Sequence, residues 1–105
     1  MELKALVGRT FAPLLFASAT VVDVVAPGPR FRRLRLKLDE PLRKPFTPGD
    51  KVQALLADAM RTYTPFAVDG QTFSLLLFVH GDTPASRFAR SVIEGAPLRF
   101  SAARR

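Results

Sequence analysis

The chain contains no cysteine and a single histidine, His80. Without cysteine there are no disulfides, thiolate metal ligands or thiol nucleophiles, and this composition fits a cytoplasmic protein. A lone histidine does not indicate a Ser/His/Asp catalytic arrangement. The aspartates are scattered and lie mostly at expected turns, where solvated or capping roles are ordinary. We therefore expect no metal site, and the residues alone name no catalytic group.

Long apolar runs are also missing. No stretch of the sequence approaches the roughly 20 apolar residues that a membrane-spanning helix needs, so no span is expected. Residues 1–15 have charged positions among short apolar ones, and Pro13 blocks a continuous helix. We interpret this segment as a short N-terminal helical arm and not as a signal peptide.

Acidic residues are few relative to basic ones: nine Asp and Glu stand against sixteen Lys and Arg, a formal charge of +7. Such a field attracts anions, including nucleic acid, phosphorylated cofactors, anionic lipid and small acidic ligands. Charge alone does not choose among them. The length of 105 residues indicates one domain, and the 48% of hydrophobic residues indicates a folded, globular chain.

The local patterns predict a mainly β domain. Residues 31–38 alternate, with Leu34, Leu36 and Leu38 on one face and Arg33, Arg35 and Lys37 on the other, as in a half-buried antiparallel strand. The basic face is the solvated side of such a strand. In total, six strands are expected, at residues 16–25, 31–38, 51–57, 60–68, 72–80 and 97–101.

Turn and cap residues separate these segments. Residues 26–29 and the pair Asp69-Gly70 indicate turns. The segment 72–80 is apolar on both faces and predicts a buried central strand. Thr83 and Pro84 suit the N-cap and first position of a helix that ends at Gly95, with an apolar stripe of Phe88, Ala89, Val92 and Ile93. Six short antiparallel strands with one helix before the last favour a small closed barrel.

The segment Arg61-Thr62-Tyr63-Thr64 suggests a binding function. In a strand, side chains alternate between faces, so Arg61 and Tyr63 point the same way. Pro65 prevents a helix here, and Thr64 adds a hydroxyl beside it. A cation, a flat ring and a hydroxyl in a row suit a ligand with a phosphate, a planar heterocycle and a polar ring edge. A flavin nucleotide has all three.

A second feature that suits anions lies between residues 80 and 89. The chain passes from a strand through His80-Gly81-Asp82 into a helix that begins near Pro84. Free backbone N–H groups and the helix dipole favour an anion at such a helix start, where Ser86 can add a hydroxyl. A plain capped helix is the structural alternative.

Taken together, the sequence resembles the flavin-binding domain of the siderophore-interacting proteins, which are ferric-siderophore reductases of the ferredoxin-reductase-like superfamily. The resemblance extends from about residue 16 to 100. It rests on Val21–Val24 with Pro29–Leu34, on Pro48–Gln53, on Arg61–Pro65, and on His80–Asp82 with Pro84–Ala89. It implies a Greek-key, ferredoxin-reductase-like barrel over residues 16–105 that binds a flavin, with FAD favoured and FMN as the less favoured alternative.

The resemblance also implies roles for particular residues. Arg61 would pair with the flavin pyrophosphate, Tyr63 would stack on the isoalloxazine ring, and Thr64 would bond near its reactive edge, with Thr62 in the same motif. The loop before the helix, with Ala85 and Ser86, would hold the pyrophosphate. His80 lies at a family-typical position near the cofactor, although a structural end-of-strand histidine is an equal interpretation.

Two departures from the family limit what is expected. The usual Gly-Pro-Arg step after the last barrel strand is replaced by Ser101-Ala102-Ala103, and the nicotinamide-binding domain of the family is expected to be absent. We therefore expect a flavin-binding electron-transfer module, and among enzymes an oxidoreductase of the ferric-siderophore reductase type. By itself, this chain is not expected to bind NAD(P)H. A partner chain or homodimer would take the place of the missing domain. The alternatives are a basic nucleic-acid-binding barrel and a truncated or partner-dependent domain without activity of its own.

Overall fold

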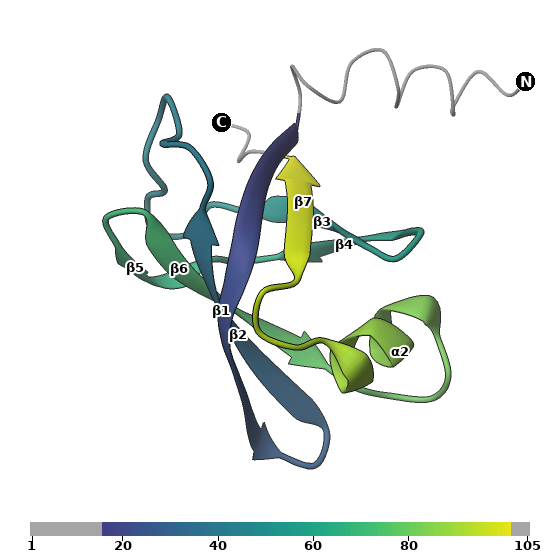
Figure 1. Ribbon diagram of the computed structural model, residues 1–105. Coiled ribbons are helices and arrows are strands. Elements are labelled where there is room, and N and C mark those ends of the chain that lie inside the picture. Colours follow the sequence, from purple (N-terminus) through teal and green to yellow (C-terminus); the bar gives the residue numbers. More distant parts are fainter. Residues whose placement is uncertain (1–15, 102–105) are drawn as a thin grey trace, which may run out of the picture.

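The computed structural model describes residues 16–101, and the arm expected over residues 1–15 lies outside them. Seven strands and one helix make up the described chain (Figure 1). Their order is β1 (Phe16–Gly28), β2 (Phe31–Leu38), β3 (Val52–Leu56), β4 (Ala59–Tyr63), β5 (Phe66–Asp69), β6 (Thr72–Phe78), α2 (Pro84–Ser91) and β7 (Pro97–Ser101). The domain is mainly β, with a short helix before the last strand, as expected.

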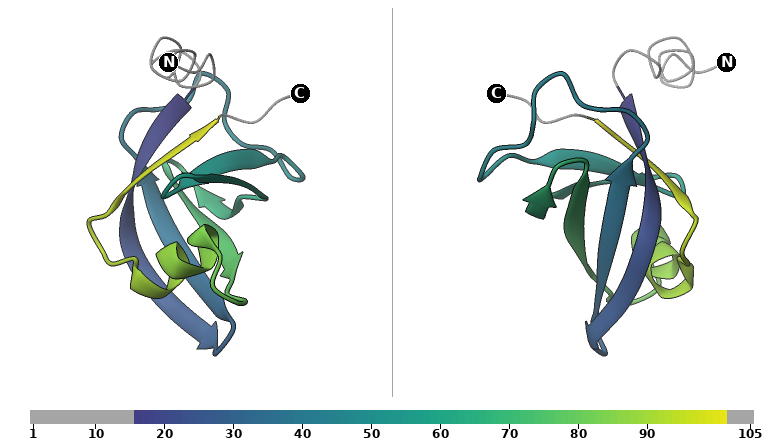
Figure 2. Two further views of the ribbon diagram at one scale, coloured as in Figure 1. Left: turned by 90° about the vertical axis from the view of Figure 1, so that its right-hand side faces the viewer. Right: turned by 60° about the vertical axis from the view of Figure 1, so that its left-hand side comes forward.

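The strands form one antiparallel sheet in the order β4-β3-β7-β1-β2-β6-β5. Strands β4 and β5 are consecutive in the chain but lie at opposite ends of this order. Only Thr64 and Pro65 join them, so Tyr63 and Phe66 are at most about 11 Å apart by three Cα steps. The sheet must therefore curl until its two edges approach each other, as Figure 2 shows.

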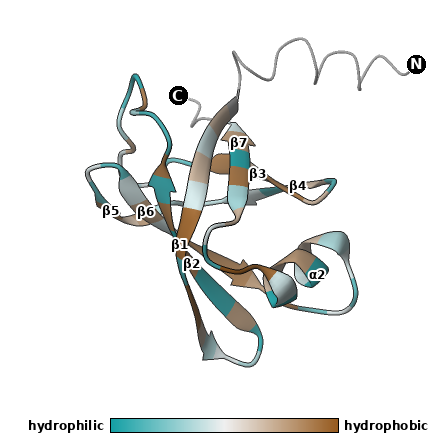
Figure 3. Ribbon diagram, viewed as in Figure 1, coloured by the Kyte–Doolittle hydropathy of each residue, from teal (hydrophilic) through white to brown (hydrophobic). Residues whose placement is uncertain are grey.

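The alternation predicted for residues 31–38 is confirmed. Leu34, Leu36 and Leu38 of β2 are buried in the core, whereas Arg33, Arg35 and Lys37 lie on the opposite, outer face. Figure 3 shows both hydrophilic and hydrophobic residues along the ribbon of β2. Strand β1 pairs with β2 on one side and with β7 on the other. The long β1–β2 hairpin is thus the centre of the sheet.

Aromatic rings fill the inside of the curled sheet. Phe73 of β6 and Phe100 of β7 are fully buried and meet edge to face, with 5.6 Å between ring centroids. Phe46, from the loop between β2 and β3, packs on both rings at 5.1 and 6.3 Å. The loop between β2 and β3 therefore supplies a ring that packs against the core.

The predicted number of six strands was wrong, because one expected strand is in fact two separate strands and the sheet has seven. Residues 60–68 were expected as a single strand, but β4 ends at Tyr63 and β5 begins at Phe66. Pro65 has no N–H to donate to a ladder, and the chain changes partner there from β3 to β6. Within residues 16–101, no ladder joins β4 to β5, so the sheet is a curled half-barrel and not the closed barrel expected.

Several boundaries also differ. Strand β1 continues through the expected 26–29 turn to Gly28, and the turn is Pro29-Arg30. Strand β6 stops at Phe78, and Leu76 and Phe78 lie exposed on the outer face instead of in the core. Here the strand has one buried and one exposed face, which a run of apolar residues concealed.

The helix ends at Ser91, four residues before Gly95, and Ile93 is 69% exposed instead of completing an apolar stripe. The reason is competition from β1. The N–H of Gly95 donates to the carbonyl of Val21 at 2.7 Å, and the N–H of Val21 donates to the carbonyl of Ala96 at 2.8 Å. These bonds hold the turn at Glu94-Gly95 against β1, so the chain leaves the helix before the predicted end.

Candidate functional site

The Arg61 motif lies on β4, an edge strand of the curled sheet. Arg61 is directly opposite Ala54 and Tyr63 opposite Val52, and both β3 partners are buried. Because opposed residues in an antiparallel pair share a face, Arg61 and Tyr63 lie on the inner side of the sheet, as the strand pattern predicted. Tyr63 is half-buried against the core, and Arg61 is exposed at the edge.

The two side chains also interact electrostatically. Burial raises the pKa of the Tyr63 phenol above its ordinary value, and the nearby positive charge of Arg61 opposes that rise. The Arg61 guanidinium donates to the carbonyl of its neighbour Met60 at 2.9 Å. The edge therefore presents a neutral aromatic ring with a cation beside it.

The two threonines of the motif are differently placed. Thr62 is opposite Gln53 and lies on the outer face, away from Arg61 and Tyr63. Thr64 follows the last residue of β4, is exposed, and precedes the buried Pro65. The structure thus brings Arg61 and Tyr63 onto one face and places Thr64 where the chain crosses from one sheet edge to the other.

Helix α2 packs beside this edge, in contact with β3, β4 and β6. Thr83 is the N-cap predicted from the sequence: its hydroxyl accepts from the N–H of Ser86 at 3.1 Å, and Pro84 occupies the first turn. The N–H of Ala85 has no acceptor among the residues described here. This first turn therefore retains a donor, as helix starts do.

The Ser86 hydroxyl is occupied within the loop. Ser86 is 1% exposed; its Oγ donates to the carbonyl of His80 at 2.8 Å and accepts from the His80 N–H at 3.0 Å. The hydroxyl therefore orders the loop, and a direct contact from it to a phosphate stays a prediction. The His80 ring is exposed and stacks on Phe78, with 5.0 Å between ring centroids.

Two helix arginines hold the loop from the other side. The Arg87 guanidinium donates to the carbonyl of Asp82 at 2.6 Å and lies 3.4 Å from the Asp82 carboxylate. Arg90 donates to the carbonyl of Gly81. The turn between β6 and α2 is thus tied back onto the helix by side chains that sequence reasoning left without a role.

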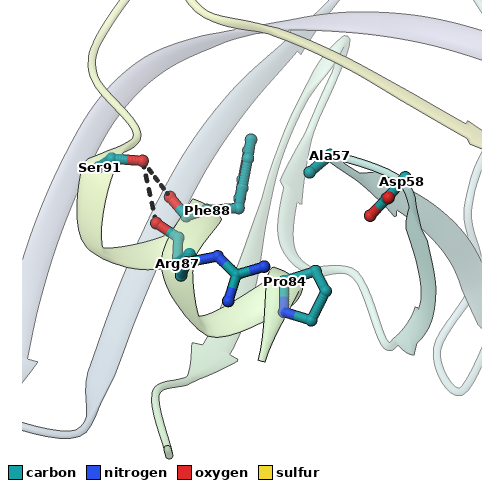
Figure 4. A pocket seen from close by; sticks show the side chains of 6 residues that line it. All are labelled: Ala57, Asp58, Pro84, Arg87, Phe88 and Ser91. Carbon is teal, nitrogen blue, oxygen red and sulfur yellow. Dashed lines mark hydrogen bonds between the residues drawn. The ribbon is translucent and has the colours of Figure 1, made fainter. Parts of the chain in front are cut away.

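An open hollow of about 550 Å³ separates α2 from the β3–β4 turn (Figure 4). Its volume is in the range of small-molecule sites. In the close-up, Asp58 lies across the hollow from the helix residues. The hollow is lined by Ala57, Asp58, Pro84, Arg87, Phe88 and Ser91.

Sequence reasoning did not predict this hollow. Asp58 was interpreted as an ordinary turn residue, Arg87 as part of a motif, and Phe88 as part of that motif and of the apolar stripe of the helix. Ala57, which lines the hollow, has a backbone φ of 58°, an uncommon value for alanine that its sequence context does not indicate. Arg61 and Tyr63 do not line the hollow themselves.

Two structural features are absent from the described residues. Between residues 16 and 101, no group of three or more His, Asp or Glu side chains is placed to hold a metal ion. Over the same residues, no helix is long and apolar enough to cross a membrane.

Comparison with known proteins gives structural matches alone: no family model and no curated protein sequence matches the chain. The fold is similar to that of the siderophore-interacting protein from Acinetobacter baumannii, with a TM-score of 0.75 and 16% identity over 86% of this chain and 41% of that one. It is similar to ferredoxin-NADP+ reductase from Plasmodium falciparum, with a TM-score of 0.69 and 14% identity over 84% and 38%.

A third match is the ferredoxin reductase in carbazole 1,9a-dioxygenase, with a TM-score of 0.71 and 19% identity over 83% of this chain and 27% of that one. The chain spans less than half the length of each of these structures. At such low identities the likeness shows the fold alone: a curled barrel like the one in these three reductase-type structures. The resemblance seen in the sequence is confirmed at that level.

Proposed function

We propose that this chain is a flavin-binding electron-transfer module with FAD as its cofactor. The observation that carries the proposal is the pair Arg61 and Tyr63, which share the inner face of an edge strand beside α2. A guanidinium matches the planar geometry of a phosphate, and a half-buried phenol ring offers a stacking surface. When bound, the flavin would supply the redox chemistry, and the protein would supply position and electrostatics.

The described residues fit such a group. Arg61 would pair with the pyrophosphate, and the unbonded N–H of Ala85 would add a donor at the start of α2. Tyr63 would stack on the isoalloxazine ring, and the exposed Thr64 hydroxyl would bond near the ring edge. Ser86 would act indirectly by fixing the His80 loop. FAD is favoured over FMN because two separate anion-binding features suit a pyrophosphate better than one phosphate.

The wider activity is a further step of the same proposal. We infer a cytoplasmic reductase of the ferric-siderophore type, in which the basic surface attracts an anionic iron chelate. The support is the likeness to the Acinetobacter baumannii protein, of which this fold corresponds to 41%. NAD(P)H would bind outside the barrel described here, on a partner chain, a second copy or another domain.

Flavin binding is tested directly by adding FAD to the purified protein, desalting the mixture and recording the visible spectrum. The expected result is a retained flavin with a shifted absorbance band. Riboflavin, which lacks the phosphates, is the matched control and should be removed by desalting. Loss of FAD on desalting without a spectral shift would refute the proposal.

A nucleic-acid-binding barrel is the second candidate, and one observation favours it. The outer face carries Phe31 and Phe78, with 5.3 Å between their ring centroids. They lie at one end of the basic face of β2, which is formed by Arg33, Arg35 and Lys37. Single-strand binders combine such rings with cationic side chains. Oligonucleotide binding that weakens steeply from low to moderate salt would support this function, and salt-independent binding would exclude it.

A further inference from the structure

A second hollow lies on the outer face of the sheet and shares no residue with the proposed flavin site. Its volume is about 220 Å³, below the range of about 300–1,000 Å³ typical of sites for drug-sized ligands. It is lined by Asp23, Arg33, Arg35, Phe66, Ala67 and Ser74. A site of this size suits a small group, such as one ring with its substituents, and not a dinucleotide.

The hollow is organised by strand register. Phe66 of β5 is opposite Ser74 of β6, Ser74 is opposite Arg35 of β2, and Arg35 is opposite Asp23 of β1. Opposed residues share a face, so these four side chains form one row across four strands. The row runs from an aromatic ring through a hydroxyl and a cation to a carboxylate.

Three of the polar groups in this hollow are available to a ligand. Among the described residues, the Arg33 guanidinium has no hydrogen-bond or ion-pair partner, and no ion pair joins Asp23 to either arginine. Arg35 makes one long bond, 3.4 Å, to the hydroxyl of Thr72. The ordinary outer face of a sheet would leave such side chains solvated, so their clustering alone is not decisive.

Ser74 is the decisive residue. It is 2% exposed, it lines the hollow, and its hydroxyl has no hydrogen-bond partner in the part of the chain described. In residues 16–101, no side-chain nitrogen or oxygen atom lacks both a hydrogen-bond partner and access to solvent. The Ser74 hydroxyl, which has no partner there, must therefore open onto the hollow that it lines.

Backbone irregularities flank the same hollow on both sides. The β1–β2 register shifts between Val21 and Asp23, and the β5–β6 register shifts between Phe66 and Asp69. Within the second shift, Ala67 has a φ of 51°, which costs energy for a residue with a Cβ. Bulges re-aim side chains and are frequent beside functional sites.

We propose that this outer hollow binds a small aromatic or heteroaromatic ring that carries one oxyanion and one hydrogen-bond donor. Arg33 and Arg35 bind the oxyanion, which is a carboxylate or a phosphate. Ser74 donates its otherwise unused hydroxyl to the same group, and the ring packs on Phe66. The Asp23 carboxylate accepts from the donor on the ring and disfavours ligands that lack one.

The probe that tests this chemistry is 4-aminobenzoate, with benzoate lacking the donor and aniline lacking the oxyanion. Phenyl phosphate distinguishes phosphate from carboxylate as the preferred anion. Binding is followed from the amide shifts of the 15N-labelled protein. We expect saturable, roughly millimolar binding with 4-aminobenzoate tightest, then benzoate, then aniline, and with shifts gathered at Arg35, Phe66 and Ser74.

Matched variants show whether the site itself is responsible. Arg35→Gln should weaken 4-aminobenzoate by roughly tenfold, as expected for loss of a bond to a charged group, and Arg43→Gln, on an exposed loop, should not. Asp23→Ala removes the acceptor and should therefore remove the preference for 4-aminobenzoate over benzoate. Ser74→Ala keeps the size of the side chain nearly unchanged and should weaken every anionic probe by a few-fold.

Four outcomes would overturn the proposal. The first is the absence of saturable binding of 4-aminobenzoate, and the second is an equal loss of its affinity in Arg35→Gln and Arg43→Gln. The third is displacement of the probe by FAD, and the fourth is binding of oligonucleotides at the hollow with an affinity that rises steadily with their length. The second would mean only general attraction by the positive surface. The third would make the hollow part of the flavin site, and the fourth would assign it to nucleic acid.

Discussion

Ser86 closes the loop between β6 and α2 by bonding to both backbone groups of one residue. Its Oγ donates to the His80 carbonyl at 2.8 Å and accepts from the His80 N–H at 3.0 Å. Thr83 completes the arrangement by capping the helix through the N–H of Ser86 at 3.1 Å. One buried hydroxyl thus joins the segment after β6 to the start of α2, a helix that contacts β4.

Replacing this hydroxyl should destabilise the fold. Ser86→Ala leaves both backbone groups of His80 without their present partner, and we expect a loss of about 1–2 kcal/mol in the free energy of unfolding. Urea denaturation followed by circular dichroism measures it. The matched control is Ser91→Ala, because the exposed Ser91 hydroxyl only bonds within its own helix. Equal losses in the two variants would contradict the role assigned to Ser86.

The phenol of Tyr63 should respond to its neighbour on β4. Burial raises the pKa of Tyr63 and the charge of Arg61 lowers it, so Arg61→Gln should raise that pKa further. Tyr63 is the chain's one tyrosine and there is no tryptophan, so the absorbance of tyrosinate reports this group alone. A pKa that stays the same or falls in the variant would show that the two side chains do not interact.

The same phenol makes stability depend on pH under alkaline conditions. The pKa of Tyr63 is higher in the folded chain than the ordinary value of 10.0, so the unfolded chain releases this proton first as the pH rises. The contribution is complete below about pH 10 and is lost as the pH rises through the folded pKa. Subtracting the pH profile of Tyr63→Phe from that of the native chain isolates it. The difference should be flat below about pH 9 and should then fall.

The sequence predicted the parts of the fold that depend on local chemistry. The alternating leucines of β2, the cap at Thr83 and Pro84, and the shared face of Arg61 and Tyr63 are all found in the structure. Each follows from a period of two or from a capping residue, so a short window of sequence contains the necessary information.

The predictions were wrong where a feature depends on pairing between segments that are far apart in the sequence. The break at Pro65 needs β5 to pair with β6, and the early helix end needs Gly95 and Ala96 to bond to Val21 of β1. The exposure of Leu76 and Phe78 depends on which face of β6 the core covers. Both hollows are likewise products of register between strands or of helix packing, so no single segment indicates them.

The aromatic core gives a test of the architecture itself. Phe100 is fully buried and contacts both Phe73 and Phe46, so Phe100→Ala should cost about 3–5 kcal/mol in the free energy of unfolding. Phe78 is 47% exposed on the outer face, and Phe78→Ala should cost far less. Urea denaturation compares the two. Similar losses would mean that the outer face is covered by other surface in solution.

Variants on β4 separate the two contacts proposed for the flavin. Arg61→Gln removes the cation but keeps a polar side chain, and we expect FAD affinity to fall by roughly tenfold or more, as for a lost bond to a charged group. Tyr63→Phe keeps the ring and should change affinity little, whereas Tyr63→Leu removes stacking worth about 0.5–1.5 kcal/mol. Titration of FAD absorbance measures each variant.

Riboflavin distinguishes these effects from general damage. It has the ring system but no phosphate, so its weak binding should be insensitive to Arg61→Gln and sensitive to Tyr63→Leu. Arg43→Gln is the control for net charge, because this exposed arginine lies on the loop between β2 and β3. If Arg61→Gln and Arg43→Gln weakened FAD equally, the positive surface as a whole would be responsible. The inner-face pair would then lose its proposed role.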